Sequence, residues 1–196
     1  MNRREVQISK RKFLILLLAM LILSVDIVYA AEPYNSYTYD YWGTPVPSPA
    51  PYIPVSIITG ESLKTVDFVN PTDLFVFNDN QIYIVDSGNN RIVVLDQNFN
   101  IEKIIDSFTN NGKVDTFNKP QGIFVNDDGE LYIADTDNAR IVHLDSEGNF
   151  LREIGPPTGE IIPDDFQYRP TALVEGKGKR IYVVALGVNQ GLLEFD

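Results

Sequence analysis

Short apolar runs separated by turn residues dominate the chain from about residue 70 onwards. The runs lie at 74–76, 82–85, 92–95 and 101–105, and again at 123–125, 131–134, 141–144 and 150–154. Runs this short and this rich in Val, Ile and aromatic residues predict β-strands. The Asn, Asp and Gly residues between them predict tight turns, so each group of four runs is expected to form an antiparallel meander.

This unit occurs three times along the chain. Its starts are marked at intervals of 49 and 50 residues by Pro71, Pro120 and Pro170. The same intervals separate Tyr83, Tyr132 and Tyr182. Four short strands in about 40–50 residues is the size of one propeller blade. We therefore expect three blades, at about residues 70–106, 118–155 and 169–196.

The first two units share a longer motif, Leu/Ile-Tyr-Ile-x-Asp-x-x-x-Asn/Ala-Arg-Ile-Val-x-Leu-Asp. Its carriers are Tyr83, Asp86, Asn89, Arg91 and Asp96, and then Tyr132, Asp135, Asn138, Arg140 and Asp145. The motif resembles the NHL repeats of β-propellers, and the resemblance extends over roughly residues 53–196. In the third unit Ala185 replaces the Asp and no Arg follows. The resemblance implies an all-β chain with about three four-stranded blades, a partial or half propeller.

Three blades are fewer than the four to eight with which propellers usually close. Residues 55–59 precede the first unit much as each fourth strand precedes the next unit, and they are expected to form an outer strand. The chain then represents a fragment of a longer propeller, a truncated gene product without function, or a half-ring completed by self-association. Open inner strands would leave adhesive edges.

The N-terminus has the pattern of a secretory signal helix. Residues 1–12 are basic, residues 13–25 are apolar and uncharged, and Val28-Tyr29-Ala30 offers a cleavage site. This combination predicts export, with cleavage after Ala30. An uncleaved anchor is the alternative, although the apolar run is short for a span of about 20 residues. The protein is therefore expected to be secreted or extracytoplasmic, with membrane contact only through this segment.

Residues 31–54 are rich in Pro and Tyr and show no apolar periodicity. Alternating prolines favour an extended, polyproline-like tether. This segment is interpreted as a linker before the repeat region 55–196, either a plain spacer or an aromatic surface for a wall polymer or partner.

Charge and residue content exclude several functions. Without residues 1–30 the chain has 11 basic and 25 acidic side chains, a net charge of −14, which disfavours nucleic-acid binding. The absence of cysteine excludes disulfides, thiol nucleophiles and cysteine zinc sites. The single histidine, His143, leaves little material for a transition-metal site or a catalytic triad. The composition fits a bacterial envelope protein.

Asp-x-x-Asn-x-Arg clusters are the most conspicuous polar features. Their carboxylates are able to bind a cation or act as bases, or they can accept turn N–H groups and pair with Arg91 and Arg140. Recurrence at the blade period favours the structural role, because an active site is normally assembled once. Calcium is the second possibility, because Asp127–Glu130 and Asp135–Asn138 offer oxygen ligands, but neither has the twelve-residue loop with its distal Glu.

We therefore expect a non-enzymatic binding or scaffold module for a protein, peptide or glycan, without a required cofactor. Propellers recognise partners through loops at one end, and the loop residues here are Asp86, Asn89, Asn90, Asp135, Asp137 and Asn138. The alternative from the resemblance is a metal-dependent lactonase of the gluconolactonase type, for which Asp73 and Asn126 are candidate residues.

Overall fold

The computed structural model describes residues 36–48, 55–78, 80–159, 162, 165–187 and 192–196. The chain separates into two units, residues 1–56 and 57–196. The predicted signal segment, residues 1–30, lies outside the described residues. Among the described residues, no helix is long and apolar enough to cross a membrane.

The first unit contains a hairpin of strands β1 (Ser36–Tyr39) and β2 (Pro45–Ser48). Asp40 organises its turn, because its Oδ1 accepts hydrogen bonds from the N–H groups of Trp42 (2.9 Å) and Thr44 (2.8 Å). Proline is tolerated here because each strand has only one neighbour. The expected polyproline-like tether is therefore wrong for residues 36–48.

Two complete blades form the start of the second unit. Blade 1 consists of β3 (Pro71–Phe77), β4 (Gln81–Asp86), β5 (Arg91–Leu95) and β6 (Ile101–Ile105), paired in that order. Blade 2 consists of β9 (Pro120–Val125), β10 (Leu131–Asp135), β11 (Arg140–Leu144) and β12 (Phe150–Ile154). All neighbours are antiparallel, which confirms the predicted four-stranded meanders.

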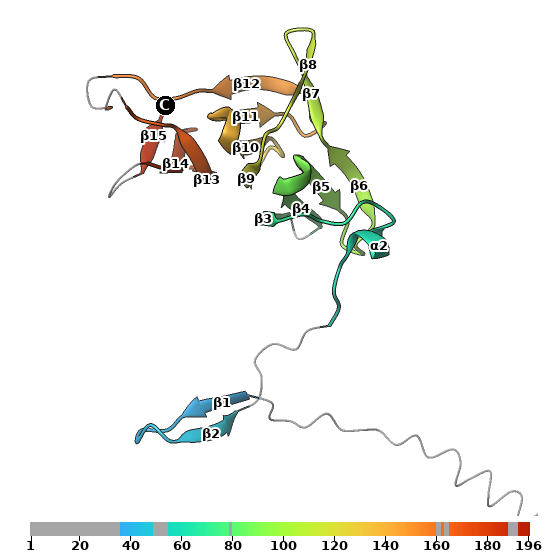
Figure 1. Ribbon diagram of the computed structural model, residues 1–196, viewed down its shortest axis with the longest axis vertical. Helices are drawn as coiled ribbons and strands as arrows, with labels where there is room; N and C mark the ends of the chain where they lie inside the picture. Colours follow the sequence, from blue (N-terminus) through green and yellow to red (C-terminus); the bar gives the residue numbers. More distant parts are fainter. Residues whose placement is uncertain (1–35, 49–54, 79, 160–161, 163–164, 188–191) are drawn as a thin grey trace, which may run out of the picture. The chain divides into compact units, whose positions relative to one another are not determined.

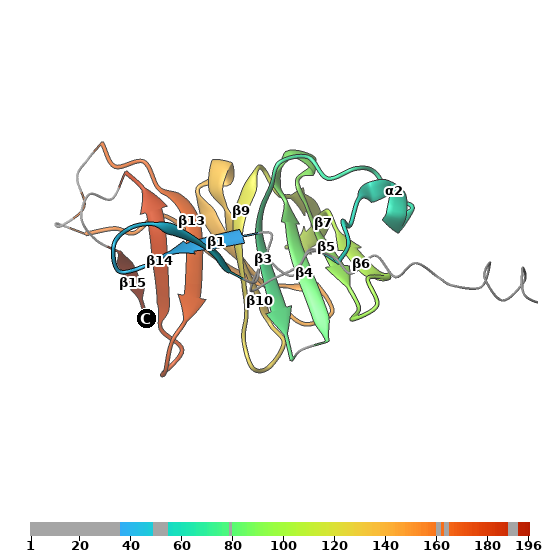
Figure 2. The ribbon, with the colours of Figure 1, turned by 90° about the horizontal axis from the view of Figure 1, so that it is seen from below.

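Blade 3 has three described strands, β13 (Arg169–Glu175), β14 (Ile181–Leu186) and β15 (Leu193–Phe195). The three sheets stand side by side like pages, with the first strands β3, β9 and β13 adjacent (Figures 1 and 2). This arrangement confirms a propeller-type fold with about three blades.

Two elements differ from the sequence-based expectations. Residues 55–59 form no strand; a short helix, α2 (Gly60–Leu63), follows them, capped by reciprocal hydrogen bonds between Thr59 and Ser62. A hairpin of β7 (Ser107–Asn110) and β8 (Lys113–Thr116), which the pattern did not reveal, connects blades 1 and 2.

The blades pack through two apolar layers. Each blade has one face turned towards the next blade in the sequence, which we call its trailing face. The opposite face, turned towards the preceding blade, is its leading face. The trailing face of blade 1, with Tyr83 and Val85, packs on the leading face of blade 2, with Leu131 and Ile133. A second layer joins the trailing face of blade 2 to the leading face of blade 3, around Tyr132, Ile141, Ile181 and Val183.

Candidate functional site

The first Asp-Asn-Arg cluster consists of Asp86, Asn89 and Arg91. We call such a cluster a clamp, because its side chains bond two segments of the chain to each other. Asp86 is fully buried and accepts hydrogen bonds from Val69 N (2.8 Å), Asn89 Nδ2 (2.8 Å) and Arg91 Nε (2.7 Å). Arg91 also donates to the Val66 carbonyl (2.7 Å). These contacts fasten the segment that enters blade 1 to the turn between β4 and β5.

The second cluster repeats this geometry in blade 2. Asp135, also fully buried, accepts from Asn118 N (2.7 Å), Asn138 Nδ2 (2.9 Å) and Arg140 Nε (2.9 Å). Arg140 additionally forms a bidentate pair with Asp115 of β8 (2.8 and 3.0 Å) and a contact with Glu153 (3.0 Å). The hydrogen bonds from Arg140 lower the pKa of Asp115 to about 2. The second clamp therefore also binds the β7–β8 hairpin to blade 2.

The remaining loop residues make contacts between neighbouring segments. The Asn90 side chain accepts from the backbone N–H of Lys119 (2.8 Å). Asp137 pairs with Lys119 (3.3 Å) and with Arg169 of blade 3 (2.7 Å). All six predicted loop residues thus take part in bonds within the protein, and the two buried carboxylates are not accessible to a ligand.

The motif aspartates Asp96 and Asp145 close the turns between third and fourth strands. Each Oδ1 accepts two backbone N–H bonds, and each Oδ2 accepts from an Asn side chain at 2.9 Å. These bonds, above all those from Asn100 and Asn149, lower the pKa of both carboxyls. Both residues therefore stabilise their turns.

The two lactonase candidates also have structural contacts. Asp73 accepts from Ile123 N of blade 2 (3.0 Å), and the Asn126 side chain accepts from two N–H groups of its own turn. Among the described residues, no group of three or more His, Asp or Glu side chains is placed to hold a metal ion.

A polar network between blades 2 and 3 was not predicted as a unit. Four positions that hold Phe77, Gln81, Val94 and Val125 at the first interface are occupied at the second by Asn126, Glu130, His143 and Glu175. Only comparison of the equivalent positions in successive repeats reveals the change. All four positions are therefore polar at the second interface, whereas three of them are apolar at the first.

His143 is at the centre of this network. Its ring stacks on Tyr132 (3.9 Å between ring centres), and its Nε2 lies 3.1 Å from Glu130 Oε2. Asn126 Nδ2 donates to Glu130 (3.0 Å) and Glu175 (3.3 Å), which joins the two blades. Burial lowers the pKa of His143, although Glu130 opposes this effect. The imidazole is thus held mainly in its neutral form.

Because His143 is buried, we expect the free energy of unfolding to depend on pH. The folded protein has a lower His143 pKa than the unfolded chain, whose value lies near 6.5. The unfolded state therefore binds the proton first as the pH falls, and the free energy of unfolding should decrease below about pH 7. The slope should not exceed about 1.4 kcal/mol per pH unit. Urea unfolding between pH 7.5 and 5.5 measures it.

The matched control is His143→Gln, which removes the only histidine of the chain. This variant should show a flatter dependence over the same pH range. The carboxylates with lowered pKa lose their contribution only at more acidic pH. An unchanged slope in His143→Gln would contradict the assignment.

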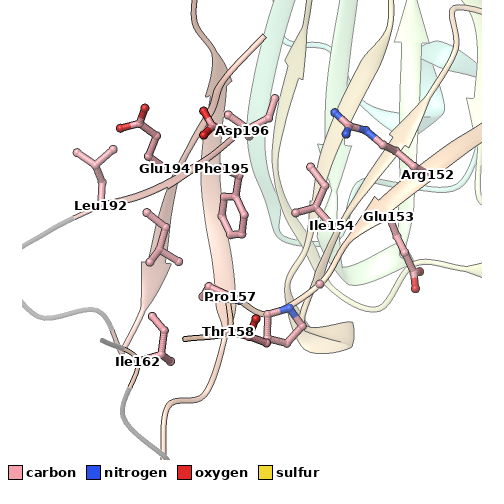
Figure 3. Close-up of a pocket in the computed structure, with 14 residues that line it drawn as sticks. Arg152, Glu153, Ile154, Pro157, Thr158, Ile162, Leu192, Glu194, Phe195 and Asp196 are labelled. Atoms are coloured by element: carbon pink, nitrogen blue, oxygen red, sulfur yellow. The ribbon is translucent and has the colours of Figure 1, made fainter. Parts of the chain in front are cut away.

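A hollow lies between blades 2 and 3, at the outer edge of blade 3. It is a groove of about 770 Å³ between the end of β12, the following segment 155–158, and β15. Ile154 and Phe195 face each other across it, and Pro157 and Thr158 lie beneath (Figure 3). Arg152, Glu194 and Asp196 contribute charges at its rim.

The corresponding space between blades 1 and 2 is filled. There Phe150 of the fourth strand β12 stacks on Phe108 of the β7–β8 hairpin, with ring centres 5.5 Å apart. Both belong to the first apolar layer. In blade 3 no described strand occupies the outer side of β15. The groove is thus the place where a fourth strand would insert its inward side chain.

Comparisons with known proteins match the repeats to a family model. The NHL repeat model matches residues 68–95 and 117–144. Solved structures with a similar fold include a streptogramin B lyase (16% identity, TM-score 0.40) and a hydrazine synthase from Kuenenia stuttgartiensis (15% identity, TM-score 0.45). The alignments cover 81% and 67% of this chain but only 46% and 32% of those chains. No curated protein matches the sequence.

The fold and the repeats define a β-propeller-type repeat protein. Its first two blades contain NHL repeats, at residues 68–95 and 117–144, as the motif around Tyr83 and Tyr132 predicts. The chain spans less than half the length of the solved structures named above. Their activities are properties of those proteins.

Proposed function

We propose that this protein is a binding module that accepts an extended segment of a partner protein as an additional strand on β15. The groove beside β15 carries the proposal, because no strand of the described residues pairs with the outer edge of β15, whereas blades 1 and 2 have a fourth strand at the equivalent place. Strand addition gives affinity through backbone hydrogen bonds and specificity through pockets for alternate side chains.

The groove defines the chemistry of the partner segment. Its walls include Ile154, Ile181 and Phe195, which favour an aromatic or branched aliphatic anchor. The fourth strands of blades 1 and 2 have the sequences IEKII and FLREI, with apolar ends and a central basic residue. Carboxylates at the rim, Glu194 and Asp196, favour a basic residue in the partner as well, although Arg180 already pairs with both (2.9 and 3.0 Å).

A fluorescent peptide with the sequence of residues 149–155, NFLREIG, is a direct probe. Anisotropy titration of the purified protein with this peptide should show saturable binding. Phe195→Ala should weaken it at least about tenfold, because the anchor loses apolar contact. A peptide in which Ser replaces the Phe and the Ile should not bind.

Leu151→Ala is the matched control, because Leu151 is exposed on β12 and does not line the groove. It should leave the peptide affinity unchanged. Circular dichroism should confirm that both variants fold. The absence of saturable binding up to millimolar peptide, or equal losses in the two variants, would refute strand addition at β15.

An extracytoplasmic location and a non-enzymatic role belong to the same proposal. The signal-like leader supports the location, and cell fractionation with N-terminal sequencing of the mature protein tests it. The role in binding is supported by the groove beside β15. Hydrolysis of lactones that is lost on chelation would instead support the alternative of a metal-dependent hydrolase.

A further inference from the structure

The leading face of blade 1 is uncovered on its inner strands. Leu74 and Val76 of β3 are 64% and 48% exposed. The equivalent residues of blade 2, Ile123 and Val125, are 4% and 2% exposed because blade 1 covers them. The repeat thus places the same apolar pattern on both blades, but within residues 57–196, as far as the structure describes them, only blade 2 has a blade packed on this side.

The trailing face of blade 3 is uncovered in the same way. Val184 of β14 is 54% exposed, whereas its equivalents Val85 and Ala134 are fully buried. Val174 of β13, on the same face, is 44% exposed. The two ends of the blade row therefore present one leading face and one trailing face, each with exposed apolar side chains on its inner strands.

The contacts between successive blades of one chain show what packs on such faces. A trailing face packs on a leading face twice within the molecule, between blades 1 and 2 and between blades 2 and 3. The leading face of blade 1 also contains a hollow of about 470 Å³, lined by Leu74, Ile84, Phe68 and Ile58. This hollow can receive apolar side chains like those that project from blade 3.

From this complementarity we infer that a second copy of this chain covers both faces. Blade 3 of each copy packs on blade 1 of the other, so the same contact forms twice around a two-fold axis. The assembly has six blades, within the range in which propellers close. The exposed apolar side chains of the inner strands, Leu74, Val76, Val174 and Val184, are then covered by the other copy.

This inference does not depend on the proposed function. The paired faces lie on the inner strands β3, β4, β13 and β14, whereas the peptide groove lies at the outer edge of β15. Peptide binding and self-association can therefore fail separately, and the two tests do not share a variant.

Sedimentation equilibrium of the purified protein tests the inference. We expect twice the mass of one chain. Val184→Asp and Leu74→Asp should each raise the dissociation constant of the two-copy form at least about a hundredfold, because each buries an unpaired carboxylate. Both residues are exposed in the single chain, so the variants should fold normally.

Val114→Asp is the matched control, because Val114 on β8 is 79% exposed but lies on neither face. This substitution should leave the mass unchanged. A wild-type protein with the mass of one chain would overturn the inference. So would open polymers of growing length, or an equal effect of all three substitutions.

Discussion

Asp86→Ala is expected to lower the free energy of unfolding by about 3–5 kcal/mol, because it leaves Arg91 buried without its carboxylate partner. The Arg91 side chain is 9% exposed, and the other contacts of its guanidinium are with neutral oxygens of Thr65 and Val66. The Val69 N–H also loses its acceptor. Stability of single domains is typically about 5–15 kcal/mol, so this loss is a large share of the total.

Asp135→Ala should have a smaller effect, although the two clamps share a motif. Arg140 retains two other carboxylates, Asp115 and Glu153, after the substitution. These contacts keep its charge compensated, and Asp115 and Asp135 together raise the pKa of Arg140 in the native protein. The expected order is therefore Asp86→Ala more destabilising than Asp135→Ala.

Urea unfolding of the two variants, monitored by circular dichroism, measures this order. Asp96→Ala is a suitable control, because this residue accepts hydrogen bonds from its own turn and pairs with no cation. Its effect should be much smaller than that of either clamp variant. Equal losses for Asp86→Ala and Asp135→Ala would contradict the compensation by Asp115.

The repeat region was predictable because two signals coincide in it. Short apolar runs define strands such as β4 and β10, and Asn, Asp and Gly define the turns between them. The recurrence of Pro71, Pro120 and Pro170 then fixes the blade length. The clamp pairs of Asp86 with Arg91 and Asp135 with Arg140 were also predictable, because their five-residue spacing bridges one turn.

The other elements depend on contacts that the local sequence does not encode. The β1–β2 hairpin lies in a Pro/Tyr-rich segment without apolar periodicity, and residues 55–59 lead into the short helix α2, capped by Thr59 and Ser62, instead of forming an outer strand. The groove at β15 arises from an unfilled position in the blade pattern. The sequence around His143 predicts an ordinary strand residue. Its place in the polar network depends on its contacts with Glu130 and Tyr132, which the local sequence does not encode.

Ile123→Ala should reduce the free energy of unfolding by about 2–5 kcal/mol, because it opens a cavity between blades 1 and 2. Ile123 is 4% exposed and belongs to the first apolar layer. Leu74→Ala removes a similar side chain at the equivalent position of blade 1, where the residue is 64% exposed. In the single chain this change should cost less than about 1 kcal/mol.

Urea unfolding at low and at high protein concentration distinguishes the effect of Ile123→Ala from that of Leu74→Ala. Ile123→Ala acts within one chain, so its effect should be the same at low and high concentration in urea unfolding experiments. Leu74→Ala should become more destabilising as the concentration rises, because the wild-type protein then gains stability from association and the variant gains less. A constant, small effect of Leu74→Ala would mean that blade 1 stays uncovered. Equal, large effects at low concentration would mean that neither face is open in the single chain.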